Sequence, residues 1–407
     1  GLQQHKIEYK NRNLGLRFYH TAENSGNTHD VSALGAVMTI AQPGGLPAYF
    51  GNYIGSYFNA LPGVVDPNPI VGLNTMIYYA QFGYTLNDII GKGGDLGVHA
   101  AARKAADANM LVPGSAAWNT AYERAVNNGI DVFAGGAGIL DTSQSNSFEV
   151  DYNLQDLIDG VDVIVGASYR DYILRSNGTL FTDYDAPIEF TDMGLYAQAQ
   201  KSLFDGAVKL TGSMRYDKSE FFEGTVTPRI GALVSLSENQ NIRFSYQTGF
   251  QNPAAQDQYI GLDIGQAVLM GSSPDNVDRF NMRLRGASGN SFNVSGNQVK
   301  MNSYTLASVQ AGAPVAAGDL GNVGPQEVKS FDLGYRINGK KTALDINAYY
   351  STWDNFISAV NVITPLYGSA STMMGLYALS QGDYKVFSYD ANTDEIVNTY
   401  GVSAGFE

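Results

Sequence analysis

The sequence predicts an all-β fold, a transmembrane antiparallel β-barrel with long extracellular loops that contain short helices. Apolar and polar residues alternate in about eleven segments, and short and long connections between those segments alternate strictly. In addition, no run approaches the roughly 18 apolar residues that a transmembrane helix requires. Because period-two alternation assigns successive side chains to opposite faces of a sheet, each segment has one apolar and one polar face.

Composition supports strands and limits the possible partners. Only 16% of the 407 residues are charged, whereas 46 are Gly, 26 Tyr and 19 Phe, a mixture that suits twisted strands better than helix bundles. The net charge of −14 argues against nucleic acid as a partner. The absence of Cys excludes disulfides and thiolate metal sites. The first residues lack a basic region and an apolar core, so we expect no signal peptide there and a chain that begins within a longer protein.

Each expected strand separates into an apolar and a polar row. In 207–216, for example, Leu210 and Met214 face one side, and Lys209 and Arg215 face the other. The same pattern places Val163, Phe331 and Ile346 in apolar rows. The eleven expected strands are 4–10, 13–22, 147–157, 161–170, 193–201, 207–216, 227–235, 242–247, 330–337, 344–351 and 397–406.

The connections favour a membrane barrel. The short ones are turns rich in Gly, Asn, Asp and Ser: Asn11-Arg12, Asp159-Gly160, Phe204-Asp205-Gly206, Ser237 to Gln240, and Asn338-Gly339-Lys340. The long ones are 23–146, 171–192, 217–226, 248–326 and 354–396. Outer-membrane barrels have this asymmetry between periplasmic turns and extracellular loops. A soluble β-protein with an apolar interior shows the same alternation but does not require the asymmetry. Since an antiparallel ring cannot close with an odd number of strands, we expect part of the wall to lie outside this sequence.

The longest loop contains its own local signals. His99 to Met110 and Ser115 to Asn127 are rich in Ala and predict two helices, which Pro113-Gly114 separates. Aromatic residues cluster at 53–58 and 76–79. A loop of this size either has a binding function or packs as a structural cap on its neighbours, and both interpretations stay open.

Several segments resemble a family of TonB-dependent receptors and transporters that is widespread in Bacteroidota. The matching stretches are Tyr19 to Asn27, Tyr53 to Gly55, His99 to Ala108, Ser176 to Phe181, Lys209 to Lys218, Asn241 to Pro253, Gln256 to Tyr259, Pro325 to Tyr335 and Asp345 to Tyr350. The resemblance covers nearly the whole chain in order. It implies a barrel of about 22 strands in the full protein, about half of them present here.

Members of this family carry a carboxypeptidase-regulatory-like domain and a plug before the barrel. The resemblance therefore implies that residues 1–407 form one outer-membrane barrel fragment without the plug and N-terminal domain, with 23–146 and 248–326 as large extracellular loops. It also implies energised import through the plug by TonB, ExbB and ExbD, in the outer membrane of a Gram-negative bacterium. The cargo class stays open among a chelate, an oligosaccharide, a peptide and a cofactor. The alternative is a structural or accessory barrel subunit of a larger outer-membrane complex, with a surface lipoprotein docked on its long loops. Lipid or lipopolysaccharide would contact the outer face in either case.

Two groups of candidate site residues follow. A lumen row comprises Arg170, Lys209, Arg215, Asp332 and Arg336, with Arg243 in the same row; these either guide anionic cargo and bond the plug, or are solvated wall residues. A possible substrate-binding group comprises Arg243, Gln251, Asn252, Asp257 and Tyr259, most of them where a strand ends in a long loop. Hydrogen bonding within the loop explains the same residues.

Metal and enzyme sites find little support. Asp390 to Asp394 begins like a calcium loop, but Glu395 replaces the required glycine, and Asp183, Asp185, Glu189 and Asp192 form a second acidic stretch. We therefore expect no metal site and no cofactor, although adventitious Ca²⁺ in these loops stays open. Gly91 to Gly94 lacks the spacing of a nucleotide loop, and the histidines (His5, His20, His29 and His99) are dispersed. We expect no catalytic residues and no enzyme activity.

Overall fold

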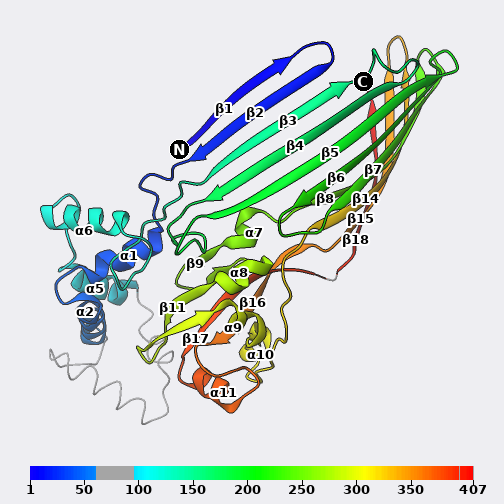
Figure 1. The fold of residues 1–407 in the computed structure, drawn as a ribbon. Helices are drawn as coiled ribbons and strands as arrows, with labels where there is room; N and C mark the ends of the chain where they lie inside the picture. The colour runs from blue at the N-terminus through cyan, green and yellow to red at the C-terminus, as the bar shows by residue number, and fades with distance from the viewer. Residues whose placement is uncertain (61–95, 394, 407) are drawn as a thin grey trace. The chain divides into compact units, whose positions relative to one another are not determined.

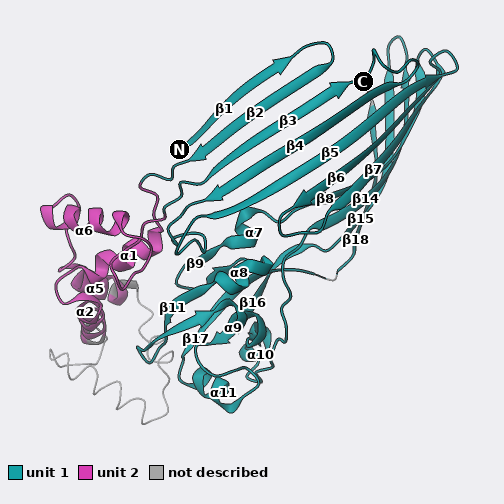
Figure 2. Ribbon diagram, viewed as in Figure 1, with its two compact units in different colours: residues 1–26, 140–407 teal, residues 27–139 magenta. Residues whose placement is uncertain are grey.

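The computed structural model describes residues 1–60, 96–393 and 395–406. The chain divides into two compact units (Figure 2). Unit 1 comprises residues 1–26 and 140–407, and unit 2 comprises residues 27–139. Unit 1 contains the strands, and unit 2 is helical over its described residues.

Unit 1 is built around an antiparallel sheet of eleven strands in which neighbours in sequence are neighbours in space (Figure 1). The strands are β1 (Leu2–Lys10), β2 (Leu14–Glu23), β3 (Gln144–Asn153), β4 (Asp162–Leu174), β5 (Ile188–Leu203), β6 (Val208–Ser219), β7 (Thr225–Ser237), β8 (Gln240–Gln251), β14 (Gln326–Asn338), β15 (Ala343–Asp354) and β18 (Val397–Phe406). All eleven expected strands are therefore confirmed. Among the described residues no pairing joins β1 to β18, so the sheet is open.

The strand register keeps an apolar face and a polar face separate across the sheet. Phe331 lies opposite Tyr246 on one neighbouring strand and opposite Tyr350 on the other. The next residue, Asp332, points to the other face and lies opposite Ser245. Residues paired across neighbouring strands lie on the same face of the sheet. Pairing apolar residues with apolar residues therefore extends the apolar row from strand to strand.

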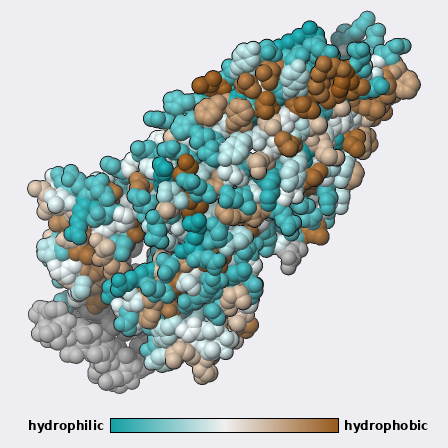
Figure 3. Space-filling model, viewed as in Figure 1, coloured by the Kyte–Doolittle hydropathy of each residue, from teal (hydrophilic) through white to brown (hydrophobic). Residues whose placement is uncertain are grey.

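The apolar face is exposed rather than packed into a core. Met214 is 58% exposed, Phe331 48%, Leu210 42% and Ile346 37%, and Val163 is partly exposed. Figure 3 shows hydrophobic side chains gathered over part of the sheet on the viewed face. A large, continuous apolar surface is unfavourable in water and is the surface that the lipid-facing side of a barrel presents.

The connections alternate between the two ends of the strands as expected. At one end they are 11–13, 154–161, 204–207, 238–239 and 339–342; at the other they are 24–143, 175–187, 220–224, 252–325 and 355–396. Two predicted lengths were wrong. The connection 220–224 is short because β6 and β7 continue further than their alternation indicates, and 154–161 is longer than a tight turn because β3 already ends at Asn153.

The two long connections after β8 and β15 fold together into a layer with its own core, which we call the loop layer. Its sheet has the order β13 (Tyr304–Thr305), β16 (Ile357–Pro365), β17 (Tyr384–Asn392), β10 (Val268–Met270) and β9 (Gly261–Asp263). A hairpin of β11 (Asn281–Arg285) and β12 (Ser291–Ser295) accompanies it, with α7 (Ala255–Tyr259), α8 (Pro274–Arg279), α9 (Gly296–Met301), α10 (Leu306–Gln310) and α11 (Met373–Ser380). Val268, Phe280 and Phe387 are fully buried in its core. The expected long loops 248–326 and 354–396 therefore contain short helices, together with short strands that the sequence did not indicate.

Unit 2 contains α1 (Val31–Ile40), α2 (Gly45–Ala60), α5 (Leu96–Asp107) and α6 (Ala116–Asn127). The two helices predicted from Ala-rich sequence are α5 and α6, and Ser115 caps α6 by accepting a hydrogen bond from the Trp118 amide. In α2, the Tyr53 hydroxyl lies 2.8 Å from Nδ1 of His99 in α5. The aromatic cluster at 76–79 and the stretch Gly91 to Gly94 lie outside the described residues. No helix in the described ranges is both long enough and apolar enough to cross a membrane.

The two faces of β6 give a direct test of the lipid-facing assignment. Replacing Met214 with Arg places a charge on the apolar face near mid-strand, where we expect a loss of about 2–4 kcal/mol in the free energy of unfolding. Ser213→Arg, one residue earlier, places the same charge on the polar face, and we expect a much smaller loss. Denaturant unfolding of the full-length protein in phospholipid vesicles measures both. Equal losses for the two variants would contradict the assignment.

Candidate functional site

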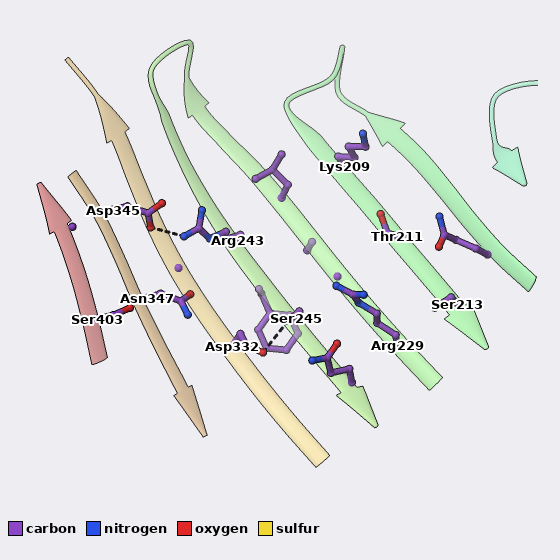
Figure 4. Close-up of a pocket in the computed structure, with 18 residues that line it drawn as sticks. Lys209, Thr211, Ser213, Arg229, Arg243, Ser245, Asp332, Asp345, Asn347 and Ser403 are labelled. Atoms are coloured by element: carbon purple, nitrogen blue, oxygen red, sulfur yellow. Dashed lines mark hydrogen bonds and ion pairs between the residues drawn. The ribbon is translucent and has the colours of Figure 1, made fainter. Parts of the chain in front are cut away.

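The polar face of the eleven-stranded sheet is hollowed by a cavity of about 890 Å³, which we call the wall cavity (Figure 4). Its charged and polar lining includes Lys209, Thr211 and Ser213 of β6, Arg229 of β7, Arg243 and Ser245 of β8, Asp332 of β14, Asp345 and Asn347 of β15, and Ser403 of β18. Each strand contributes residues at alternate positions, as period two requires. The same rule that exposes apolar side chains on one face therefore assembles this polar surface on the other.

The wall cavity has more cations than anions. Arg243 forms an ion pair with Asp345, and Ser245 donates a hydrogen bond of 3.2 Å to Asp332. Lys209 and Arg229, in contrast, make no hydrogen bond or ion pair with another described residue. The cavity can therefore attract negative charge, whether from a solute or from another protein segment.

A second cavity, of about 390 Å³, lies nearer the long connections, and we call it the rim cavity. The polar face of β3 to β6 forms one side, with Ser147, Ser168, Arg170, Tyr172, Phe190, Asp192, Arg215, Asp217 and Lys218. The end of β8 and the segment that follows it form the other side, with Phe250, Asn252, Pro253, Ala254, Ala255 and Gln258. The cavity is thus enclosed between the wall and the start of the loop layer.

The cations of the rim cavity already have partners. The Arg215 guanidinium forms a bidentate contact with Asp217, at 2.8 and 2.9 Å from Nε, and donates to Ser168 Oγ at 3.0 Å. A Cβ at Gly194 would lie 2.2 Å from Arg215 Nη2, so the glycine leaves the space that this contact needs. Lys218 donates to the carbonyl oxygen of Phe222 at 2.7 Å, and Arg170 donates to the Tyr172 hydroxyl at 3.1 Å.

Two residues that line the rim cavity each have a buried oxygen without a partner among the described residues. These oxygens are Oε1 of Gln258 and Oδ1 of Asp192. Gln258 is only 3% exposed, and its Nε2 donates to the Pro253 carbonyl oxygen at 2.8 Å. That bond fixes the orientation of the amide and leaves the oxygen to the other side. A buried acceptor without a donor costs free energy, and neither oxygen has a surface that a water-sized group could reach.

The structure distributes the predicted lumen row over both cavities. Lys209, Asp332 and Arg243 line the wall cavity. Arg170 and Arg215 line the rim cavity. Arg336 belongs to the same row of β14 but lines neither cavity, and its Nε donates to Asn338 Oδ1 at 3.2 Å.

The five predicted substrate-binding residues do not form one site. Arg243 is eight positions before Gln251 in β8, roughly 27 Å along the strand. Gln251 is exposed and accepts a hydrogen bond from Gln326, and Asp257 accepts one from the Ala254 amide. Tyr259 is fully buried, packs against Phe190 and donates to Asp275 at 3.1 Å. Of the five, Asn252 alone lines the rim cavity. The structure separates the five because positions that are close in sequence lie far apart along an extended strand.

Several cavity residues were absent from the predicted groups. Arg229 and Asp345 fall in the polar rows of their strands, so the alternation rule could have added them to the lumen row. Asp192 was assigned only to an acidic loop, since the alternation did not show that β5 begins as early as Ile188. Gln258 has no signal in the sequence, because its position depends on how the loop layer folds against the wall.

The acidic stretches are part of the folded framework. The Asp183 carboxylate is buried and accepts hydrogen bonds from the amides of Ser176, Asn177 and Gly178, so it holds the turn after β4. Asp390 and Asn392 lie in β17, and position 394 is outside the described residues. Among the described residues, no three His, Asp or Glu side chains come together in a way that could hold a metal ion. Adventitious binding of Ca²⁺ stays an untested prediction.

Comparison with known protein families decides the class of the protein. The model of the family described as "TonB dependent receptor-like, beta-barrel" matches residues 17–407, nearly the whole chain. The chain belongs to this family. TonB-dependent receptors are transporters of Gram-negative outer membranes and not enzymes, which confirms the expectation that the chain is no enzyme. The match also confirms that the open sheet is barrel wall.

Several solved structures are similar to this chain at low identity. The siderophore receptor PirA of Pseudomonas aeruginosa is 14% identical with a TM-score of 0.40, and the alignment covers 66% of this chain and 40% of PirA. A mutant of the ferric enterobactin receptor PfeA of the same species is 11% identical with a TM-score of 0.41, and the alignment covers 65% of this chain and 33% of PfeA. The iron transporter FrpB of Neisseria meningitidis is 12% identical with a TM-score of 0.38, and the alignment covers 67% of this chain and 35% of FrpB. The match therefore spans two fifths or less of these receptors' length. No sequence among the curated proteins matches the chain.

Replacing Asp183 tests whether its carboxylate holds the turn through hydrogen bonds or through a calcium ion. Asp183→Ala leaves one buried and two partly buried amides without their acceptor, and we expect local stability at 175–187 to fall by about 3 kcal/mol. Limited proteolysis of the full-length protein should then show faster cleavage in this segment. The matched control, Asp185→Ala, removes an exposed carboxylate and should change nothing. We expect EDTA to leave the wild-type pattern unchanged; if EDTA reproduced the effect of Asp183→Ala, calcium would hold the turn.

Asp390 makes the stability of the loop layer depend on pH. Burial, with a further contribution from the nearby Asp257 carboxylate, raises the pKa of Asp390 to about 7, from 3.8 ordinarily. A raised carboxyl pKa means that the folded state favours the protonated form, so stability is highest below pH 4 and falls as the pH rises to about 7. With a discount for partial exposure, we expect a loss on the order of 1–2 kcal/mol. Hydrogen exchange of the β17 amides at pH 5 and pH 8 measures it. Asp390→Asn should remove this dependence, and an unchanged dependence in that variant would assign it to another group.

Proposed function

We propose that the chain forms the outer-membrane barrel wall of a TonB-dependent importer. The observation that supports this most strongly is the separation of an exposed apolar face from a charged, hollowed face along the same strands. A lipid-facing surface and a polar passage together are what an importer of this family requires. In this proposal, lipid or lipopolysaccharide contacts the apolar face, and the two cavities face the passage.

The proposal includes the remaining parts of an energised system. A plug encoded in the same gene would fill the passage and couple it to TonB, ExbB and ExbD. We also propose a bacterium of the Bacteroidota kind and a carboxypeptidase-regulatory-like domain before the plug, on the sequence resemblance alone. The cargo is a chelate, an oligosaccharide, a peptide or a cofactor that is too large for general porins.

A second function, as an accessory barrel that docks another surface protein, has one observation in its favour. The short helix α11 of the loop layer exposes three large side chains, with Met373 79% exposed and Met374 and Tyr377 also outside the core. Exposed apolar clusters of this kind are common at protein interfaces. A surface lipoprotein on this layer would fit either function, so energised uptake is what separates the two.

Deletion of the TonB box tests the proposal in the intact organism. A strain that lacks the gene is compared with the wild type on a panel of iron chelates, glycans, peptides and cofactors as limiting nutrients. Complementation with the full-length gene should restore growth on one of them, and the same gene without its TonB box should not. Surface labelling of the loop layer in both strains controls for correct assembly. If the truncated gene restored growth fully, energised import would be rejected and the accessory function would be favoured.

A further inference from the structure

We infer that His5 and His20, at one end of the apolar face, form a binding site for a divalent transition-metal ion such as Cu²⁺ or Zn²⁺. The register of β1 and β2 places the two histidines directly opposite each other, and their rings stack with centroids 6.2 Å apart. Imidazole nitrogen is a preferred ligand of these ions. The inference goes against the expectation from sequence that the chain has no metal site, because strand pairing brings together two histidines that are dispersed in the sequence.

A chain of hydrogen bonds determines which ring nitrogen of His20 carries the proton. The ionised Asp171 carboxylate can only accept, so Nδ2 of Asn146 donates to it at 2.9 Å. This leaves Oδ1 of Asn146 at 2.8 Å from Nδ1 of His20, and Nδ1 must therefore be the donor. In neutral His20 the lone pair consequently lies on Nε2. Histidines that bind metal ions commonly donate their other N–H to an oxygen in this way, which holds the ring in place.

The ring nitrogens that a metal ion needs are available. Neither Nε2 of His20 nor either ring nitrogen of His5 makes a hydrogen bond with another described residue. A tetrahedral ion at about 2.0–2.1 Å from one nitrogen of each ring would place the ring centroids roughly 5 Å apart. The imidazole of His5 is exposed, so a rotation of its side chain can close the difference from 6.2 Å. Water would occupy the remaining coordination positions of the ion.

The histidine pair lies where the wall meets water. A row of paired aromatic residues, Phe18, Phe148 and Tyr169, crosses the apolar face of β2, β3 and β4. Aromatic rows of this kind mark the boundary of the hydrocarbon in outer-membrane barrels. His20 is two residues beyond Phe18 towards the connection 24–143, which is about 7 Å further along the strand. Dissolved ions can reach a site at that position, whereas hydrocarbon would exclude them from a site deeper in the wall.

The surroundings of the pair favour a transition-metal cation over other ions. The Asp171 carboxylate, acting through Asn146, supports positive charge on the other side of the His20 ring. The net charge of −14 likewise attracts cations to the chain. Mg²⁺ and Ca²⁺ prefer oxygen ligands and gain little from two imidazoles. Among the divalent first-row ions Cu²⁺ binds nitrogen ligands most tightly, which makes it the most sensitive probe.

Electron paramagnetic resonance of Cu²⁺ tests the site in the full-length protein, purified in detergent without a histidine tag. We expect a spectrum with two coupled imidazole nitrogens in the wild type, and its loss in both His5→Gln and His20→Gln. Excess Zn²⁺ should displace the Cu²⁺, and excess Mg²⁺ should not. His29→Gln is the matched control, because His29 belongs to unit 2 and should leave the spectrum unchanged. A two-nitrogen spectrum that both site variants keep, or its absence from the wild type, would overturn the inference.

Asp171→Asn tests the contribution of the hydrogen-bonded chain. An amide at position 171 can donate as well as accept, so the Asn146 amide loses its fixed orientation and the proton of His20 is no longer confined to Nδ1. We expect the affinity for Cu²⁺ to fall about tenfold, with both nitrogens still coupled at saturating Cu²⁺. Asp162→Asn makes the same change at an exposed position of the same strand and should bind as the wild type does. Equal affinities of the two variants would contradict a positioning role for Asp171.

Binding of Cu²⁺ requires neither an energy supply nor cargo, so its result is independent of the TonB-box test. A receptor that required its TonB box but gave no two-nitrogen spectrum would retain the proposed function and exclude this inference. A receptor that gave the spectrum but supported growth without its TonB box would do the reverse.

Discussion

Every feature of this chain depends on the pairing of backbone amides and carbonyls between adjacent strands. Hydrocarbon offers no water to hydrogen-bond the backbone, so a strand in a bilayer must satisfy these groups through its neighbours. From β1 to β18 each inner strand pairs on both sides. The one register shift in the wall, between Ser235 and Ser237, lies beside the 238–239 connection, at the end of the strands. The two faces consequently stay separate along the membrane-facing length.

The same pairing creates the cavities. A fixed register brings Arg243 of β8 into contact with Asp345 of β15, two strands away, and Arg215 of β6 into contact with Ser168 of β4. These contacts cross an intervening strand at a glycine, Gly334 in the first case and Gly194 in the second, where a Cβ would lie within 2.4 Å of the guanidinium. The arrangement of charges on the polar face therefore depends on the glycines that leave room for the arginines as well as on the charged residues themselves.

The wall could be predicted from sequence because its rule is local. Whether a residue stands at an odd or an even position of its strand decides its face, which separates Leu210 from Lys209 and Phe331 from Asp332. The loop layer could not be predicted, because β10 and β17 are separated by more than one hundred residues and pair in parallel. Its strands are short, and no period marks them. The rim cavity lies where the two meet. Alternation therefore places Arg170 and Arg215 on the polar face of the wall, whereas no local pattern shows that Gln258 lines the cavity or that Tyr259 is buried.

Alternate residues of one wall strand meet lipid and water in turn. Because this chain contains no cysteine, single cysteines can be placed at each position from 208 to 216 of β6 in the full-length protein in vesicles. A fluorophore on each is then quenched either by brominated lipid or by a water-soluble quencher. We expect lipid quenching at Val208, Leu210, Gly212, Met214 and Tyr216, and aqueous quenching at the positions between them. Uniform access of the aqueous quencher along the strand would contradict a membrane-spanning wall.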